Sequence, residues 1–317
     1  MYHLEYRQSS EVHLRVMPII ELQEVSKLYG FGDATTVALD EVTLTIDAGE
    51  FVAIMGPSGS GKSTLMNVIG LLDRPTHGNF KLNGRQVERL RPTRQAKARR
   101  DTIGFVFQSF NLLPKLSVLD NVALPLAYKG MSQARRQKRA AEILDRVGLS
   151  DREYFMPRQL SGGQAQRAAI ARALINNPNI IIADEPTGNL DSAASRLVME
   201  LLSDVHKAGN TILMVTHNPE LTRYASRVVF MHDGTVIADE ESTIGEVHES
   251  LRRSMYFMPR TTEEDDLAGV SALMSALPDE PTNKKKATKP KKKSKTPRTK
   301  YKAEPKSAPK SKKRSKK

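Results

Sequence analysis

The chain contains the run Gly56-Pro57-Ser58-Gly59-Ser60-Gly61-Lys62-Ser63. The apolar segment Phe51–Met55 before it predicts a buried strand, and Thr64–Ile69 after it predicts the first turns of a helix. Glycines let the backbone curl so that successive N–H groups face one anion, and the helix N-terminus adds unpaired donors. In such a loop Lys62 reaches the β- and γ-phosphates, and the hydroxyl of Ser63 ligates Mg²⁺. We therefore expect Gly56–Ser63 and Thr64 to bind a nucleotide.

The length and composition narrow the class of protein. At 317 residues the chain can bury one large core or two modest ones. It has no cysteine, so it uses neither disulfides nor thiolate metal ligands, which suits a reducing compartment. No apolar stretch approaches the roughly 18 residues that span a bilayer, and no signal-peptide pattern opens the chain. We expect any role at a membrane to come through a partner or a surface contact.

The formal net charge of +13 is concentrated at one end of the chain. Residues 283–317 contain 18 Lys and Arg and a single acid, Glu304, so their net charge is +17. The remaining residues are slightly acidic, with a net charge of −4. Because a segment rich in Lys, Pro, Ser and Thr cannot bury enough apolar surface to fold alone, we expect a disordered basic tail.

The hydrophobic pattern changes along the chain. Residues 1–16 show no clear periodicity, and we expect a disordered extension there. Residues from about 18 to 50 alternate apolar and polar positions, which predicts antiparallel strands, and residues from about 110 to 160 are helical in pattern. After residue 160 helices and strands alternate, which predicts a parallel sheet covered by helices. The predicted elements are helices at 164–175 and 192–208 and strands at 80–82, 103–107, 180–183, 211–215, 228–231 and 235–238.

Two further motifs follow the phosphate-binding loop. The apolar strand Ile180–Ala183 runs into Asp184, a carboxylate that can hold Mg²⁺ through its water shell, and Glu185 is then the candidate general base for an attacking water. Ser161-Gly162-Gly163-Gln164 precedes a helix and can form a second anion site without a lysine. The residues alone leave an ordinary helix N-cap as an equal alternative for this segment.

In this order the motifs resemble an ATP-binding-cassette (ABC) ATPase over about residues 18 to 240. The resemblance implies an α/β P-loop NTPase fold, with a mainly parallel core sheet, an antiparallel β subdomain and an α-helical subdomain at about 110–160. It implies an ATPase domain at 17–240. The extension after residue 240 is not part of the shared pattern, and its residues alone predict a linker at 241–282 with a short helix near Glu246–Arg253, followed by the basic tail at 283–317. The resemblance also implies ATP and Mg²⁺ as ligands, with hydrolysis of ATP to ADP and phosphate.

The resemblance assigns roles to four more residues. Gln108 is similar to the glutamine that contacts Mg²⁺ and the attacking water, and Asp191 to the carboxylate of the loop that crosses a dimer interface. His217 is similar to the histidine that bonds the γ-phosphate, and Tyr29 to the aromatic that stacks on adenine. From the residues alone, His217 would be interpreted as a structural histidine at a strand end, and the alternative for Tyr29 is a half-buried strand tyrosine.

The resemblance also implies partners. In this family the segment corresponding to Ser161–Gln164 closes over the nucleotide of a second subunit, so we expect a head-to-tail homodimer. The stretches Gly70–Thr76, Gln108–Leu112 and Ala183–Asp191 resemble the branch of macrolide-exporter, lipoprotein-releasing and cell-division ATPases. That branch implies a permease with a large extracytoplasmic domain, which would dock at a groove formed by Gln108–Val122. The chain would then lie peripherally on the cytoplasmic face of the membrane.

A second class stays open, that of a non-transport ABC ATPase which acts on nucleic acid or the ribosome through the basic tail. ABC proteins that act in translation have two cassettes, whereas this chain has one. Those that act in DNA repair have a long coiled coil between the phosphate-binding loop and the segment that corresponds to Ser161–Gln164. Here only 98 residues run from Ser63 to Leu160, counting both ends, which favours the transporter type. Seventeen net charges would bind anionic lipid or nucleic acid, or would stay solvated without a partner.

Overall fold

The computed structural model describes residues 18–30 and 35–241. The predicted N-terminal extension at 1–16, the linker with its helix near Glu246–Arg253 and the basic tail all lie outside the described residues.

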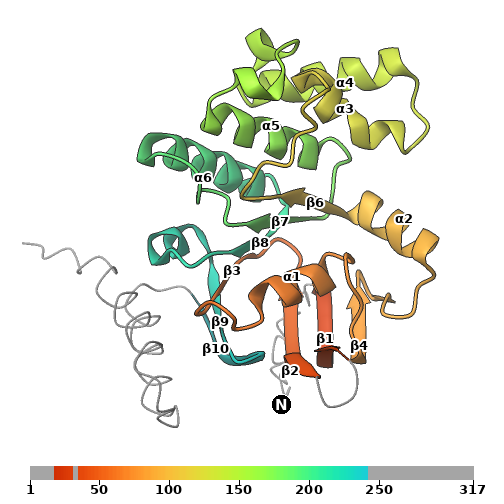
Figure 1. Ribbon diagram of the computed structural model, residues 1–317, viewed down its shortest axis with the longest axis vertical. Helices are drawn as coiled ribbons and strands as arrows, with labels where there is room; N and C mark the ends of the chain where they lie inside the picture. Colours follow the sequence, from red (N-terminus) through yellow and green to blue (C-terminus); the bar gives the residue numbers. More distant parts are fainter. Residues whose placement is uncertain (1–17, 31–34, 242–317) are drawn as a thin grey trace, which may run out of the picture. The chain divides into compact units, whose positions relative to one another are not determined.

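The described residues form two β-sheets, and helices pack around the larger one (Figure 1). The strands are β1 (Pro18–Tyr29), β2 (Thr36–Asp47), β3 (Phe51–Met55), β4 (His77–Leu82), β5 (Arg85–Gln86), β6 (Ile103–Val106), β7 (Ile180–Asp184), β8 (Thr211–Val215), β9 (Arg227–His232) and β10 (Thr235–Glu241). The smaller sheet is antiparallel with the order β2-β1-β4-β5, and the larger has the order β10-β9-β3-β8-β7-β6. From β9 to β6 the neighbouring strands are parallel, and β10 is an antiparallel edge strand.

The helices follow the predicted order, with one addition. They are α1 (Lys62–Ile69), α2 (Pro92–Thr102), α3 (Val118–Ala127), α4 (Gln133–Arg146), α5 (Gly162–Leu174) and α6 (Ser192–Lys207), with short 3₁₀ turns at Ser150–Arg152, Pro157–Gln159 and Pro219–Tyr224. The sequence pattern did not predict α2, because this helix has no apolar stripe and buries only Gln95. Within the described part of the chain, every helix is too short or too polar to cross a bilayer.

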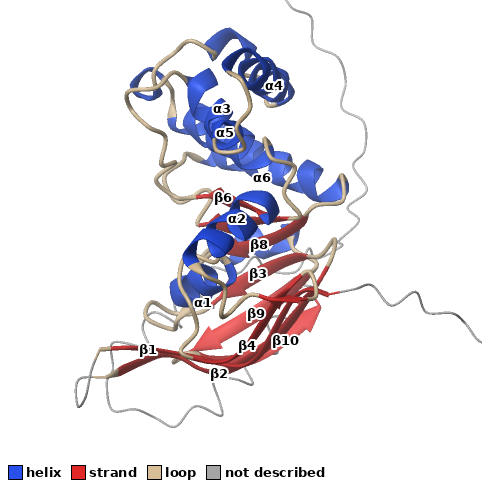
Figure 2. Ribbon diagram, turned by 90° about the vertical axis from the view of Figure 1, so that its right-hand side faces the viewer, coloured by secondary structure: helices blue, strands red, loops and turns tan. Residues whose placement is uncertain are grey.

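The parallel strands are apolar at nearly every position because helices cover both faces of the sheet. In β3, Val52 and Ile54 pack into a core with α1, whereas Phe51, Ala53 and Met55 pack into a second core with α6. A third core joins α3, α4 and α5 (Figure 2). This third cluster confirms the helical pattern predicted for residues 110–160, and the period-2 pattern of residues 18–50 is confirmed by β1 and β2.

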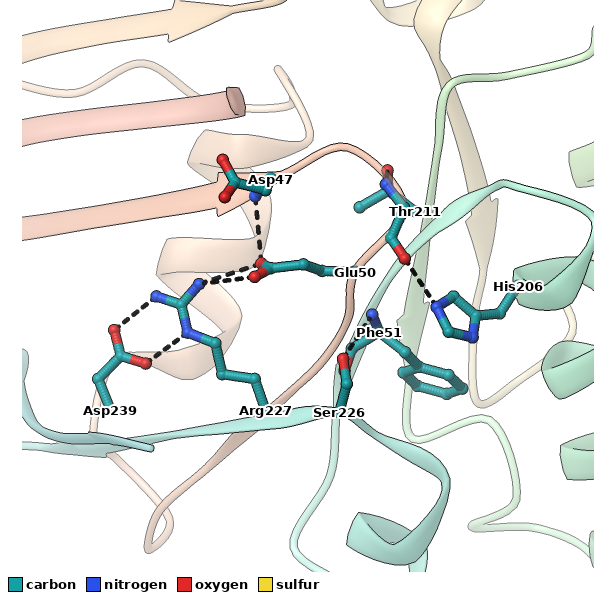
Figure 3. A network of polar contacts seen from close by, with 9 residues as sticks. Asp47, Glu50, Phe51, His206, Thr211, Ser226, Arg227 and Asp239 are labelled. Atoms are coloured by element: carbon teal, nitrogen blue, oxygen red, sulfur yellow. Dashed lines mark hydrogen bonds and ion pairs between the residues drawn. The ribbon is translucent and has the colours of Figure 1, made fainter. Parts of the chain in front are cut away.

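A polar network ties the N-terminal ends of β3, β8 and β9 together (Figure 3). The guanidinium of Arg227 makes paired hydrogen bonds of 2.6 and 2.7 Å to Asp239 and of 3.0 and 3.3 Å to Glu50. The hydrogen bonds that Arg227 donates to Asp239, with the charges of Asp239 and Glu50, raise the pKa of Arg227 above its ordinary value, although burial acts in the opposite direction. Beside it, His206 Nε2 hydrogen bonds to the carbonyl of Gly49 at 2.8 Å. The network therefore fixes the β10 edge and the turn before β3 to the same arginine.

Replacing Arg227 by Met is expected to destabilise the protein by about 2 kcal/mol, because two partly buried carboxylates lose charge-assisted hydrogen bonds. For a unit of this size the thermal midpoint should fall by about 4–8 °C in a melting experiment. Lys207→Met is the matched control, since its ion pair with Asp204 is exposed on both sides and should contribute less than about 1 kcal/mol. Equal decreases in the thermal midpoint of the two variants would show that the Arg227 network stabilises the fold no more than an exposed ion pair does.

Candidate functional site

The phosphate-binding loop connects the C-terminal end of β3 to the start of α1. Gly61 is the N-cap of α1 with a φ of +93°, and a Cβ at this position would lie 2.5 Å from the carbonyl oxygen of Ala38. Only glycine fits this backbone. In the described structure α1 has no side-chain cap, so its first N–H groups point out of the helix end without a side-chain acceptor. That end of α1 is suited to hold phosphate oxygens.

Lys62 lies folded over the loop. Its Nζ donates hydrogen bonds to the carbonyl oxygens of Gly56 at 2.9 Å and Pro57 at 2.6 Å. Burial lowers the pKa of Lys62, while the negative charges of Glu185 and Asp184 act in the opposite direction. The ammonium therefore lies in the loop at the place where a bound triphosphate would need a cation.

The other candidate residues follow the ends of three strands beside β3. The strands β3, β8, β7 and β6 are adjacent and parallel, so their C-terminal ends form one edge of the sheet. The phosphate-binding loop follows β3, His217 follows β8, Asp184 ends β7 and Gln108 follows β6. The structure thus brings together residues that are up to 161 positions apart in the sequence, at the edge where ligands bind in open α/β sheets.

Glu185 is held by groups at the end of β8. Its backbone has a φ of +44°, which is unusual for a residue with a side chain, and its N–H donates to the carbonyl of Val215 at 2.9 Å. The carboxylate accepts hydrogen bonds from Thr216 Oγ1 at 3.1 Å and from the His217 backbone N–H at 2.8 Å. The ring Nδ1 of His217 also lies 2.6 Å from Oε1 of Glu185, the oxygen that accepts from the His217 N–H. These bonds fix Glu185, whose side chain is 16% exposed, whereas His217 is 69% exposed.

The candidate metal ligands are Ser63, Gln108 and Asp184. Burial, and secondly the charge of Glu185, raise the pKa of Asp184, and the charge of Lys62 only partly opposes them. All three side chains offer oxygen atoms, which are the ligands that Mg²⁺ prefers. Within the described ranges, no group of three His, Cys, Asp or Glu residues could hold a metal by itself. The donor set therefore fits a Mg²⁺ that takes its remaining ligands from phosphate oxygens and water.

Gln108 packs against the loop that follows Glu185. A Cβ on Gly188 would lie 2.7 Å from Gln108 Nε2, so the glutamine side chain fills the space that this glycine leaves. The backbone carbonyl of Gln108 accepts a hydrogen bond from Asn189 Nδ2 at 3.0 Å. Movement of Gln108 would therefore be transmitted to the loop that leads to α6.

The segment Ser161–Gln164 forms a reciprocal cap at the start of α5. Gln164 N–H donates to Ser161 Oγ at 3.3 Å, and Ser161 N–H donates to Gln164 Oε1 at 2.9 Å. Cβ atoms on Gly162 and Gly163 would lie 3.1 Å from Leu190 and 2.8 Å from Ala194, so the glycines allow close packing on the loop before α6 and on its first turn. In the ranges that the structure describes, no hydrogen bond or ion pair joins this segment to the phosphate-binding loop.

Asp191 is the N-cap of α6, where its Oδ1 accepts a hydrogen bond from the Ala194 N–H at 2.8 Å. Because Leu190 and Ala194 pack on the glycines of Ser161–Gln164, the structure places Asp191 beside this segment.

Tyr29 ends β1 and is 42% exposed, with its hydroxyl bonded to Asp73 Oδ2 at 2.8 Å. Tyr29 belongs to the antiparallel sheet and is near Thr64. Burial, and secondly the hydrogen bond to Asp73 and the charge of that residue, raise the pKa of the phenol, and the Thr64 side chain only partly opposes them.

Two residues near the site were missed in the sequence. Thr216 holds the Glu185 carboxylate, and the fully buried Gln166 donates from Nε2 to the carbonyl of Pro186 at 2.7 Å. A polar residue among the alanines of α5 was a signal that could have pointed to Gln166. The role of Thr216 depends on β8 lying beside β7, which no local pattern reveals.

Comparisons with known proteins agree on one family. A model of the ABC transporter family matches residues 39–188. The chain is 49% identical over 222 residues to the macrolide export ATP-binding/permease protein MacB of Hyphomonas neptunium. This match covers 70% of this chain and 34% of that protein. It is 49% identical over 226 residues to the ABC transporter ATP-binding protein YvrO of Bacillus subtilis, over 71% of this chain and 99% of that protein. The chain thus spans about a third of the MacB relative and nearly all of YvrO.

Solved structures give the same result. The dimeric structure of the ATP-binding cassette MJ0796 bound to ADP and Pi matches with a TM-score of 0.65 and 47% identity, covering 70% of this chain and 98% of that one. CbiO1 from Clostridium perfringens, part of an ABC transporter complex, matches with a TM-score of 0.65 and 29% identity over 77% of this chain.

Proposed function

The chain belongs to the ABC transporter family, as an ATP-binding subunit with ATPase activity, and we propose that it acts as a head-to-tail homodimer driving a membrane permease. The observation that carries the proposal is the convergence of Lys62, Asp184, Glu185 and His217 at one edge of the parallel sheet. The ATPase domain is proposed to extend over residues 17–240, with the helical subdomain at about 110–160.

The residues at this edge of the sheet have different roles in the proposed hydrolysis. The N–H groups of the loop Gly56–Ser63 bind the phosphates, and Lys62 turns from the carbonyls of Gly56 and Pro57 to the β- and γ-phosphates. Mg²⁺, when bound by Ser63, Asp184 and Gln108, neutralises charge on the transferred phosphoryl group.

Glu185 takes the proton of the attacking water. Two hydrogen-bond donors, the Thr216 hydroxyl and the His217 backbone N–H, hold its carboxylate in place beforehand, so little reorganisation is needed during the reaction. The exposed ring of His217 is then available to bond the γ-phosphate, in place of its present contact with Glu185.

Two observations support the dimer. Ser161–Gln164 lies at the start of α5, and in the described ranges no hydrogen bond or ion pair joins it to the chain's own phosphate-binding loop, so it suits the nucleotide of a second copy. The similar cassette MJ0796 is dimeric in its solved structures. Asp191 lies beside the same segment and would therefore face the interface.

The permease is proposed to be a separate subunit with a large extracytoplasmic domain, so that the chain sits on the cytoplasmic face of the membrane. The name of the MacB relative, an ATP-binding/permease protein, supports a permease as the partner of the ATP-binding part. The proposed contact is the surface around Gln108–Val122. Exposed Leu113, Tyr154 and Met156 lie there, since Val118 N–H bonds the carbonyl of Phe155 at 2.9 Å. The basic tail is proposed to bind anionic lipid or nucleic acid.

Purification of the tagged chain from mild-detergent extracts of its native membranes is expected to recover a permease. A double substitution, Leu113→Asp with Tyr154→Asp, should remove that permease while the thermal midpoint stays unchanged, because both side chains are exposed. Leu197→Asp is the matched control, since Leu197 is also an exposed leucine but belongs to α6 and not to the segments of the proposed contact. Recovery of nucleic acid or ribosomes alone, after nuclease treatment and at high salt, would contradict the transport function.

A further inference from the structure

The hydroxyl of Tyr29 is anchored by a carboxylate from another part of the chain. Tyr29 is the last residue of β1, and its hydroxyl donates a hydrogen bond of 2.8 Å to Asp73 Oδ2. Asp73 belongs to the turn that follows α1, 44 residues away in the sequence. Without this bond, an exposed tyrosine at a strand end could rotate freely about its side-chain bonds.

Asp73 is itself held from the opposite side. Its Oδ1 accepts hydrogen bonds of 2.7 Å from both Lys27 Nζ and the backbone N–H of Arg74. Burial opposes ionisation of Asp73, but the bonds from Lys27, Arg74 and Tyr29 outweigh it and leave the pKa of this carboxyl below its usual value. Asp73 is therefore an ionised acceptor throughout the neutral range.

Lys27 completes the arrangement. Its side chain is only 12% exposed, and its Nζ also donates to the carbonyl of Arg74 at 2.9 Å. The same ammonium lies over the Tyr29 ring, 4.8 Å from the ring centroid, in a cation–π contact. Because Lys27 covers one face of the ring, a planar ligand would have to stack on the other face.

The turn that contains Asp73 connects this cluster to the phosphate-binding helix. The Asp73 N–H donates to the carbonyl of Asn67 in α1 at 3.1 Å, and the Leu28 N–H donates to Thr76 Oγ1 at 3.1 Å. The Tyr29 ring is therefore fixed relative to α1, whose first turn contacts the phosphates. A ring with such a fixed position can present its face to the base of a nucleotide whose phosphates bind at the loop.

We propose that Asp73, supported by Lys27, is a positioning residue that orders the Tyr29 ring for stacking on the nucleobase of ATP. The inference rests on the proposed binding of ATP and on the contact between Tyr29 and the base that the family resemblance implies. Its physical basis is preorganisation, because a ring that is already ordered loses less rotational freedom when the nucleotide binds.

The test measures the dissociation constants of the full-length chain for ATP and for inorganic tripolyphosphate, which has no base, by calorimetry. Tyr29→Ala should weaken ATP binding about 10- to 100-fold, the range expected for a lost base–aromatic stack. Tyr29→Phe and Asp73→Asn should each weaken it about fivefold, the equivalent of about 1 kcal/mol. In Asp73→Asn, the single oxygen of the new amide is needed by Lys27 and the Arg74 N–H and leaves no acceptor for the Tyr29 hydroxyl. The double variant Tyr29→Phe/Asp73→Asn should therefore also lose about fivefold, because both changes remove the same bond.

Tripolyphosphate binding should stay unchanged in all four variants. The control is Asp101→Asn, which removes a carboxylate of similar exposure that is paired with Arg100. It should leave both constants unchanged.

The outcomes separate the inference from the proposed function. Normal ATP affinity in Tyr29→Ala would overturn the base contact and the anchor with it. Weak ATP binding in Tyr29→Ala, with normal or tighter binding in Tyr29→Phe and Asp73→Asn, would overturn the positioning role alone. An equal loss of ATP and tripolyphosphate affinity in Asp73→Asn would also overturn it, because the effect would then be a general loosening of the turn.

Discussion

Glu185→Gln is expected to bind ATP normally and to lose ATPase activity by a factor of about 100 to 10,000, the usual contribution of a general base. Glutamine keeps one oxygen that can accept the hydrogen bond from the His217 N–H, and its amide NH₂ can donate to the Thr216 hydroxyl, so the local fold should remain. It cannot take a proton from water. Because ATP is then bound but not cleaved, the variant should accumulate as an ATP-bound dimer.

Phosphate release measures the loss of activity, and size-exclusion chromatography with light scattering at saturating ATP measures the dimer. Glu200→Gln, which changes an exposed carboxylate on α6, should behave like the unaltered protein in both experiments. Retained phosphate release in Glu185→Gln would contradict the role of Glu185 as the base. A variant that stays monomeric with ATP bound would contradict the head-to-tail dimer.

Lys62→Ala is expected to weaken ATP binding itself by about 10- to 100-fold, the value of a charge-assisted hydrogen bond to phosphate. The lysine is the cation nearest to the loop carbonyls of Gly56 and Pro57, and burial strengthens its interaction with an anion. Since the stabilisation of the folded chain by ATP grows with the logarithm of its affinity, the rise in thermal midpoint that ATP produces should become smaller.

Calorimetric titration with ATP gives the affinity directly, and the midpoint without ATP shows whether the variant is folded. Lys81→Ala is the control, because this lysine pairs with Glu21 on the antiparallel sheet and has no contact with the loop. Unchanged ATP affinity in Lys62→Ala would show that the assignment of Lys62 is wrong.

Much of the fold could be predicted from local patterns. The predicted strand at 211–215 coincides with β8, and the predicted helix at 192–208 differs from α6 by a single residue. These elements are predictable because they bury one stripe or both faces, and hydrophobic periodicity reports burial. The helix α2 has no such stripe, since arginine and glutamine side chains attach it to Leu71 and Arg74, and so its sequence resembles a loop.

The candidate site, like the fold, could be predicted from the sequence only in part. The loop from Gly56 to Ser63 is a contiguous motif, because one short segment supplies the curled backbone, the lysine and the hydroxyl that a phosphate needs. The sequence alone therefore determined that the chain binds a nucleotide, and the order of the later motifs indicated the ABC family.

Only the tertiary structure decided which side chains hold the reacting groups. Thr216 and His217 support Glu185 because β8 lies between β3 and β7, although it follows β7 in the sequence. Asp73 reaches Tyr29 because the turn after α1 runs beside the end of β1. Strand order and the packing of turns depend on the burial of side chains from the whole chain, so a pattern within one segment carries no information about them.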